Sequence, residues 1–181
     1  EASAVALDSE GNIILVGTTF GDLELSSDEA KPGGKDIFVA KLHPKSGDLI
    51  WTRLLGSSRN DDVHAVAVGE STIYLAGATH GNFRRPSSGK SDAWLAFVSL
   101  KNGELLDAVQ FGHADRDSLD AVAIAPDGDL ILAGSTDGNF ADCNAGLKDV
   151  WVARVHPERA IAFFSAFDHD RHLSQPCSNK G

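Results

Sequence analysis

The sequence lacks several features, and each absence argues against a class of protein. No apolar run approaches the roughly 18 residues that a membrane-spanning helix needs, and no basic-then-apolar signal segment opens the chain. No membrane span is therefore expected. Methionine is absent from all 181 residues. Because translation starts with methionine, we expect a processed, excised or truncated piece of a longer protein.

Basic residues are scarce as well. Lys and Arg number 16 against 26 Asp and Glu, which gives a formal net charge of −10. A surface of this sign repels phosphate backbones, and this argues against nucleic acid as a partner. Hydrophobic residues make up 42% of the chain, enough for a core, but they show no sustained helical periodicity. The absence of helical periodicity, together with short β-branched runs bounded by turn-forming residues, predicts an all-β protein.

A ten-residue stretch is present three times, at residues 35–44, 91–100 and 148–157. Its aspartates, Asp36, Asp92 and Asp149, are 56 and 57 residues apart. Two short apolar runs precede each copy and one follows it, with turn-forming residues between them. The pattern predicts four antiparallel strands per repeat, joined as a meander. In the third repeat the fourth strand is expected at residues 161–167.

Four-stranded meanders repeated at about this length are typical of β-propellers, in which each repeat is one blade. We assign residues 1–56 to blade 1, 57–112 to a linker and blade 2, 113–167 to a linker and blade 3, and 168–181 to a C-terminal tail. Known propellers contain roughly four to eight blades. Three blades would form a partial ring, so further blades or a second copy are expected to close it.

The recurring stretch is expected to serve folding. Its aspartate should anchor the loop that enters the third strand of each blade. Its aromatic residue, which is Phe38, Trp94 or Trp151, should pack against the next blade.

Residues 33–51 read Gly-x-x-Asp-x-Phe-Val-Ala-Lys-Leu, then a Gly-containing turn and Trp51. This segment resembles the bacterial-type SBBP β-propeller repeat, with His43 in place of the usual Asp. The linkers at residues 56–62 and 112–117 resemble it too. The resemblance implies a propeller fold without enzyme activity, and a secreted, cell-surface or lumenal location within a large protein.

Three long connections, at residues 20–35, 80–91 and 137–148, are expected at the same end of the blades as the linkers. Long loops on a rigid scaffold commonly carry binding sites. We therefore predict a site for a protein or glycan partner at this end. The predicted binding residues are Phe20, Phe83, Phe140, Asp61, Asp62, Asp115 and Asp117.

The acidic linkers leave two interpretations open. Their carboxylates could hold calcium, or they could fix turns through backbone hydrogen bonds, as aspartate commonly does in loops. No EF-hand loop is present, so no cofactor or metal ligand is assigned. Cys143 and Cys177 are expected near each other at the long-connection end. We predict a disulfide there, with two unpaired thiols as the alternative.

No catalytic constellation emerges, since His64 and His113 lie apart from any nucleophile motif. The sequence predicts a non-enzymatic interaction or structural module, part of a larger secreted or complex-associated protein. A lectin-like propeller is one alternative, and it would use the three phenylalanines. A quinoprotein-type enzyme is another, because residues 43–51 resemble the docking segment of such propellers. Against it, the other repeats place Asp107 and Phe163 where the first has Trp51.

Overall fold

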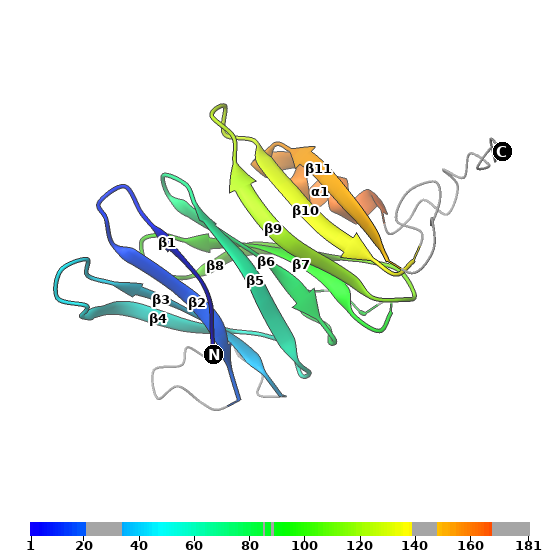
Figure 1. Ribbon diagram of the computed structural model, residues 1–181, viewed down its shortest axis with the longest axis horizontal. Helices are drawn as coiled ribbons and strands as arrows, with labels where there is room; N and C mark the ends of the chain where they lie inside the picture. Colours follow the sequence, from blue (N-terminus) through cyan, green and yellow to red (C-terminus); the bar gives the residue numbers. More distant parts are fainter. Residues whose placement is uncertain (21–33, 85, 88, 139–147, 168–181) are drawn as a thin grey trace.

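The computed structural model describes residues 1–20, 34–84, 86–87, 89–138 and 148–167, and these form three antiparallel sheets and one helix (Figure 1). The first sheet contains β1 (Ala2–Leu7), β2 (Ile13–Thr19), β3 (Asp36–Leu42) and β4 (Leu49–Leu55). The second contains β5 (Asp61–Val68), β6 (Thr72–Thr79), β7 (Asp92–Ser99) and β8 (Leu105–Phe111). The third contains β9 (Asp117–Ile124), β10 (Leu130–Thr136) and β11 (Asp149–Val155). The predicted all-β class and the meander order of each repeat are confirmed.

The predicted fourth strand of the third repeat is wrong. Residues 161–167 belong instead to a helix, α1 (Pro157–Phe167). Proline suits the first turn of a helix because it has no N–H to leave unbonded, and Glu158 adds a favourable charge to that turn. Ala160 and Phe164, one helical turn apart, are both fully buried. The third sheet therefore has three strands, and the helix occupies the end of the repeat.

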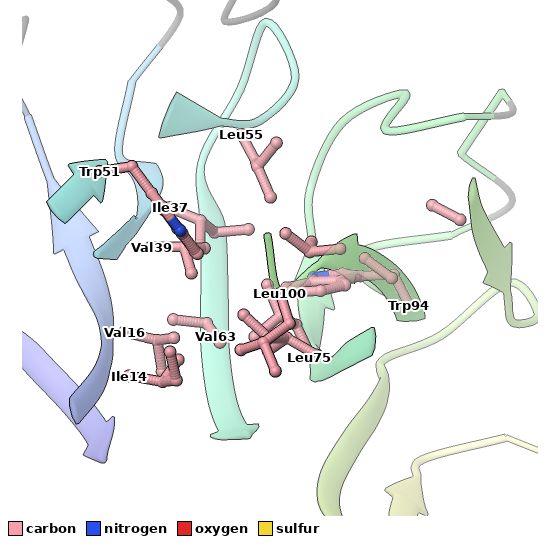
Figure 2. Packing of buried hydrophobic residues seen from close by; sticks show 14 residues of the cluster. Ile14, Val16, Ile37, Val39, Trp51, Leu55, Val63, Leu75, Trp94 and Leu100 are labelled. Carbon is pink, nitrogen blue, oxygen red and sulfur yellow. The ribbon is translucent and has the colours of Figure 1, made fainter. Parts of the chain in front are cut away.

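The three sheets stack face to face and enclose two apolar cores. Between the first and second sheets, Ile14 and Val39 pack with Val63 and Trp94 (Figure 2). Between the second and third sheets, Leu95, Phe111 and Leu132 pack together with Phe164 of the helix. The first strand of each sheet, which we call the innermost strand, lies at one edge of its sheet. These strands also contact one another, β1 with β5 and β5 with β9. The stack is thus held from core to core along its length.

The recurring aromatic residue packs in the opposite direction from the one predicted. Trp94 of the second sheet lies in the core shared with the first sheet, and Trp151 of the third lies against the core shared with the second. Each ring therefore faces the preceding sheet, not the next one. The prediction that these aromatics join repeats is confirmed, but its direction is corrected. Sequence spacing gives the position on the strand and not the face that the neighbour covers.

A bulge recurs in every innermost strand. The pairing register shifts between Ala2 and Ala4 and between Val63 and Ala65, which leaves Ser3 and His64 outside the ladder. In β9 the same position is Asp120. Such bulges bend a strand and redirect one side chain. The three equivalent residues, Ser3, His64 and Asp120, are all exposed.

Among the described residues, no helix is both long enough and apolar enough to cross a membrane.

Candidate functional site

The long-connection end is the end of the stack at which β2 and β6 end, β3 and β7 begin, and the two inter-sheet linkers lie. Backbone hydrogen bonds fasten each linker to the sheet that precedes it. The N–H of Asp61 donates to the carbonyl oxygen of Lys35 at 2.7 Å, and the N–H of Asp117 donates to that of Ser91 at 2.9 Å. These bonds occupy equivalent places in successive repeats. The first and second repeats therefore use the same backbone hydrogen bond to join a linker to the preceding sheet.

Buried carboxylates complete each linker. Oδ2 of Asp61 accepts the N–H of Ser57 at 2.6 Å, and Oδ2 of Asp117 accepts the N–H of His113 at the same distance. Both side chains are almost fully buried. Burial raises the pKa of Asp61 and of Asp117 above the ordinary value, although hydrogen-bonding neighbours oppose the shift. In this conformation the two carboxylates bind the chain itself and do not reach solvent.

The other two predicted aspartates are at the surface and form ion pairs. Asp62 pairs with Lys35, and Asp115 pairs with Lys90 at 2.9 Å. Both carboxylates remain accessible at the long-connection end. In the part of the chain that the structure describes, no three His, Cys, Asp or Glu side chains come together as metal ligands would.

The predicted aromatic residues differ in their surroundings. Phe20 is 79% exposed. Phe83 stacks on Trp94 with ring centroids 5.0 Å apart, and its N–H donates to Oε1 of Gln110 at 2.8 Å. The two are not equivalent, because Phe20 follows Thr19 directly whereas Phe83 lies four residues after the corresponding Thr79. Phe140, Cys143 and Cys177 lie outside the described residues, so their predicted roles stay predictions.

A groove of about 530 Å³ lies on the outer face of the first sheet. Its lining includes the apolar residues Phe38, Ala40 and Leu49, together with Phe20 and Lys35. Sequence reasoning did not identify this groove. The available signal was Phe38 itself, which occupies the same position of the repeat as Trp94. Trp94 packs on the preceding sheet, whereas no sheet precedes the first one within the described residues.

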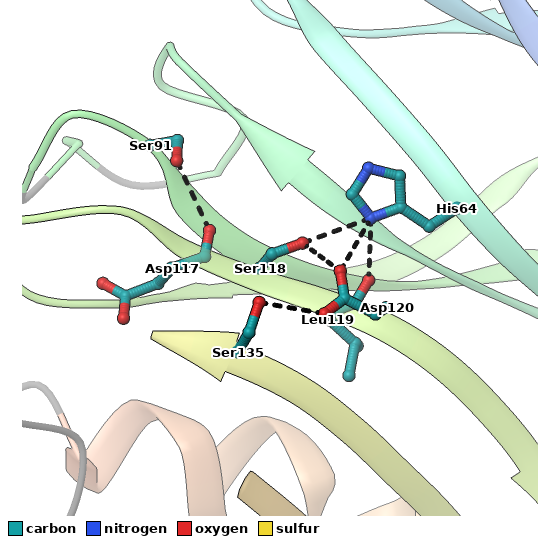
Figure 3. A network of polar contacts seen from close by, with 7 residues as sticks. All are labelled: His64, Ser91, Asp117, Ser118, Leu119, Asp120 and Ser135. Carbon is teal, nitrogen blue, oxygen red and sulfur yellow. Dashed lines mark hydrogen bonds and ion pairs between the residues drawn. The ribbon is translucent and has the colours of Figure 1, made fainter. Parts of the chain in front are cut away.

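A polar network joins the second and third sheets at the innermost edge (Figure 3). Nδ1 of His64 lies 3.2 Å from Oγ of Ser118 and 3.4 Å from Oδ1 of Asp120. Ser118 also donates to Asp120 at 2.6 Å, and Ser135 donates to the other oxygen of the same carboxylate at 3.0 Å. His64 is thus not the isolated residue that the sequence suggested, because β5 contacts β9 and His64 lies outside the β5–β6 ladder.

The residue types of this network are those of a hydrolase triad, but the geometry differs. In a triad the serine contacts one ring nitrogen of the histidine and the aspartate contacts the other. Here Ser118 and Asp120 both approach Nδ1 of His64. This arrangement does not pass a proton from serine through the ring to the carboxylate. It fastens β5 to β9.

No known family model matches the chain, and no curated protein matches it.

Proposed function

We propose that this chain is a non-enzymatic, propeller-type structural and interaction module within a larger secreted or complex-associated protein, and that it binds a protein partner at the long-connection end. The observation that carries the proposal is the repeated locking of the linkers. Equivalent backbone bonds to Lys35 and Ser91, and equivalent buried carboxylates at Asp61 and Asp117, give that end a rigid base. Rigid scaffolds that present variable connections are suited to recognition.

The propeller part of the proposal is supported by the way in which the sheets follow one another. Each is a meander, each packs against the sheet next to it in the chain, and the innermost strands contact each other in chain order. The meanders, together with the recurring bulges, fit blades arranged around a common axis.

Site-specific crosslinking tests the binding end. A photoreactive phenylalanine is placed at Asp115, at the long-connection end, or at the exposed Lys101, in the turn between β7 and β8 at the opposite end. Irradiation in the secreted-protein fraction of the source cells should give an adduct from position 115 that excess unlabelled chain suppresses. Position 101 serves as the matched control. Equal adducts from both positions, or none that the unlabelled chain suppresses, would contradict the proposal.

A lectin-like function is a second candidate, and the exposure of Phe20 beside the groove favours it. Exposed aromatic rings that stand near polar side chains are suited to stack on sugar rings. Phe83 stacks on Trp94 instead, so the lectin candidate loses one of its three predicted sugar-stacking residues. A glycan array distinguishes the candidates: binding that Phe20→Ala abolishes and Phe163→Ala retains would favour the lectin. Phe163 is a fair control because it is partly exposed on α1.

The quinoprotein alternative has the least support. Trp51 lies almost fully buried in the first core. Its counterpart in the second repeat is Asp107, and Phe163 of the third repeat lies in the helix. The recurrent tryptophan on which that resemblance depends is therefore present in one repeat.

A further inference from the structure

Each sheet has two faces, which we name by the order of the chain. The leading face packs against the following sheet, and the trailing face packs against the preceding one. On the leading face of the first sheet, Ile37 and Val39 are fully buried. The matching residues of the second sheet, counted from the recurring aspartate, are Ala93 and Leu95, which are also fully buried.

The third sheet has the same leading face, but nothing among the described residues covers it. Its matching residues are Val150 and Val152, which are 80% and 71% exposed. Ala133 pairs with Val152 across the ladder and continues the apolar face. Helix α1 does not cover it, because Phe164 packs with Phe111 in the core on the trailing side. Two β-branched apolar residues therefore face solvent at positions that are buried in both other sheets.

The first sheet shows the complementary situation on its trailing face. Val5 and Leu7 of β1 are each 63% exposed, whereas the matching Val66 and Val68 of β5 pack into the first core. Leu49 is also exposed, and it lines the groove with Phe38. At the two interfaces within the chain, the equivalent trailing face is covered by the leading face of the preceding sheet. On the first sheet this position is the groove.

We propose that the leading face of the third sheet binds the trailing face of the first sheet in a second copy of this chain. The chain itself supplies the argument for that occupant, because it uses this leading-to-trailing contact twice and, within the described residues, leaves one half of the contact uncovered on each outer sheet. The two uncovered faces lie at opposite ends of the stack (Figure 1). Within one chain they do not touch, and each can be covered by the matching face of another copy. Reciprocal contact joins two copies into a closed arrangement of six sheets. This inference goes beyond the proposed function, since it does not depend on what the long-connection end binds.

Charged substitutions test the pairing and its direction. The unaltered chain should sediment as a dimer of twice 19.1 kDa. Val152→Glu on the leading face and Leu7→Glu on the trailing face should each weaken the dimer on the order of 100-fold, because a glutamate would be buried without a partner. Both residues are exposed in the single chain, so neither change should lower the urea midpoint of the monomer. Leu106→Glu is the matched control, since Leu106 is 55% exposed on the outer strand β8, and it should dimerise normally.

Mixing the two variants provides the decisive measurement. Leu7→Glu chains keep an intact leading face and Val152→Glu chains keep an intact trailing face. An equimolar mixture should therefore form a heterodimer through one interface, while each variant alone stays monomeric. A mixture that stays monomeric would overturn the proposal. So would an unaltered chain that is monomeric at all concentrations or grows beyond the dimer, or a dimer that either variant leaves intact.

Discussion

Buried aspartates in this chain have opposite environments. Asp8 accepts the backbone N–H of Asn12 at 2.8 Å and its side-chain amide at 2.9 Å, and it pairs with Lys41 at 2.9 Å. Burial alone would raise the pKa of Asp8, but these donors lower it to about 2. Asp61 and Asp117 lack a lysine partner among the causes of their shifts, and burial raises the pKa of both. The same residue type should therefore give opposite pH dependences.

The double substitution Asp61→Asn and Asp117→Asn should flatten part of the pH dependence of stability. A carboxyl group whose folded pKa is raised contributes stability fully below its unfolded value and loses that contribution as the pH rises through the folded value. Relative to the unaltered chain, the variant should thus be more favoured at pH 7 than at pH 4. Urea unfolding across this range measures the difference, and a difference independent of pH would contradict the argument.

Asp8→Asn should have the opposite pH profile. The folded pKa of Asp8 is about 2 and its ordinary value is 3.8, so its contribution is present above 3.8 and is lost as the pH falls toward 2. At pH 7 the loss of the charged hydrogen bonds should cost about 1–3 kcal/mol of unfolding free energy. The cost should shrink on acidification. A constant cost from pH 7 to pH 3 would show that the charge of Asp8 is not the cause.

At the scale of the element, a glycine opposite each bulge explains both the bulge and the recurring aromatic. Gly77 pairs with Val63 on one side and with Trp94 on the other. A Cβ at Gly77 would collide with the backbone oxygen of Asp62 and with the Trp94 ring. Gly17 and Gly134 are placed in the same way against Phe38 and Trp151. The aromatic ring covers the space that the glycine leaves.

Gly77→Ala should therefore destabilise the fold by about 1–3 kcal/mol, the usual range for overpacking a close contact. Gly138→Ala is the matched control, because a Cβ there would make ordinary van der Waals contacts. Thermal or urea unfolding of both variants measures the difference. Equal stabilities would mean that the strands separate at little cost.

Helix α1 gives a second prediction at this scale. Phe164 is fully buried and stacks on Phe111 with ring centroids 4.1 Å apart, whereas the adjacent Phe163 is 40% exposed. Phe164→Ala should cost about 3–5 kcal/mol of unfolding free energy, as is typical of a buried phenylalanine, and Phe163→Ala should cost much less. Urea unfolding of the pair tests whether the helix is part of the core. Similar costs would argue that it is not.

Sequence patterns predicted the elements well where repetition was strong and failed where it ended. The recurring aspartate and aromatic located every third strand, and β3, β7 and β11 begin at Asp36, Asp92 and Asp149. The helix was missed because its apolar residues are close enough together to resemble a strand. Their spacing of four, from Ala160 to Phe164, was the available signal. The linkers were also misjudged in part, since Asp61 and Asp117 already belong to strands β5 and β9.

For the whole molecule, nearest-neighbour packing sets the distribution of stability. The second sheet has a core on each face, while the first and third have one core each. In arrays of this kind stability is close to a sum of unit and interface contributions. Native-state amide hydrogen exchange of the monomeric Val152→Glu variant should therefore show the slowest exchange in β6 and β7. Slower exchange in β2 or β10 would contradict a nearest-neighbour array.

The candidate surfaces were harder to predict than the fold because they depend on which face a neighbour covers. Val39 and Val152 are the same residue type at the same position of the repeat, yet Val152 is exposed and Val39 is buried. The same holds for the linkers, where Asp61 is buried and the adjacent Asp62 is at the surface. Alternation along a strand predicts that such neighbours differ. It does not say which of them meets solvent.

The main-chain bonds that fasten the linkers have a consequence for how such a protein can change over generations. The joints at Asp61–Lys35 and Asp117–Ser91 use backbone atoms, and they recur with the repeat length. A gene duplication or deletion of one whole repeat would recreate the same joint on both sides of the change. Whole repeats can thus be gained or lost during evolution, independently of sequence changes in the connections that each repeat carries.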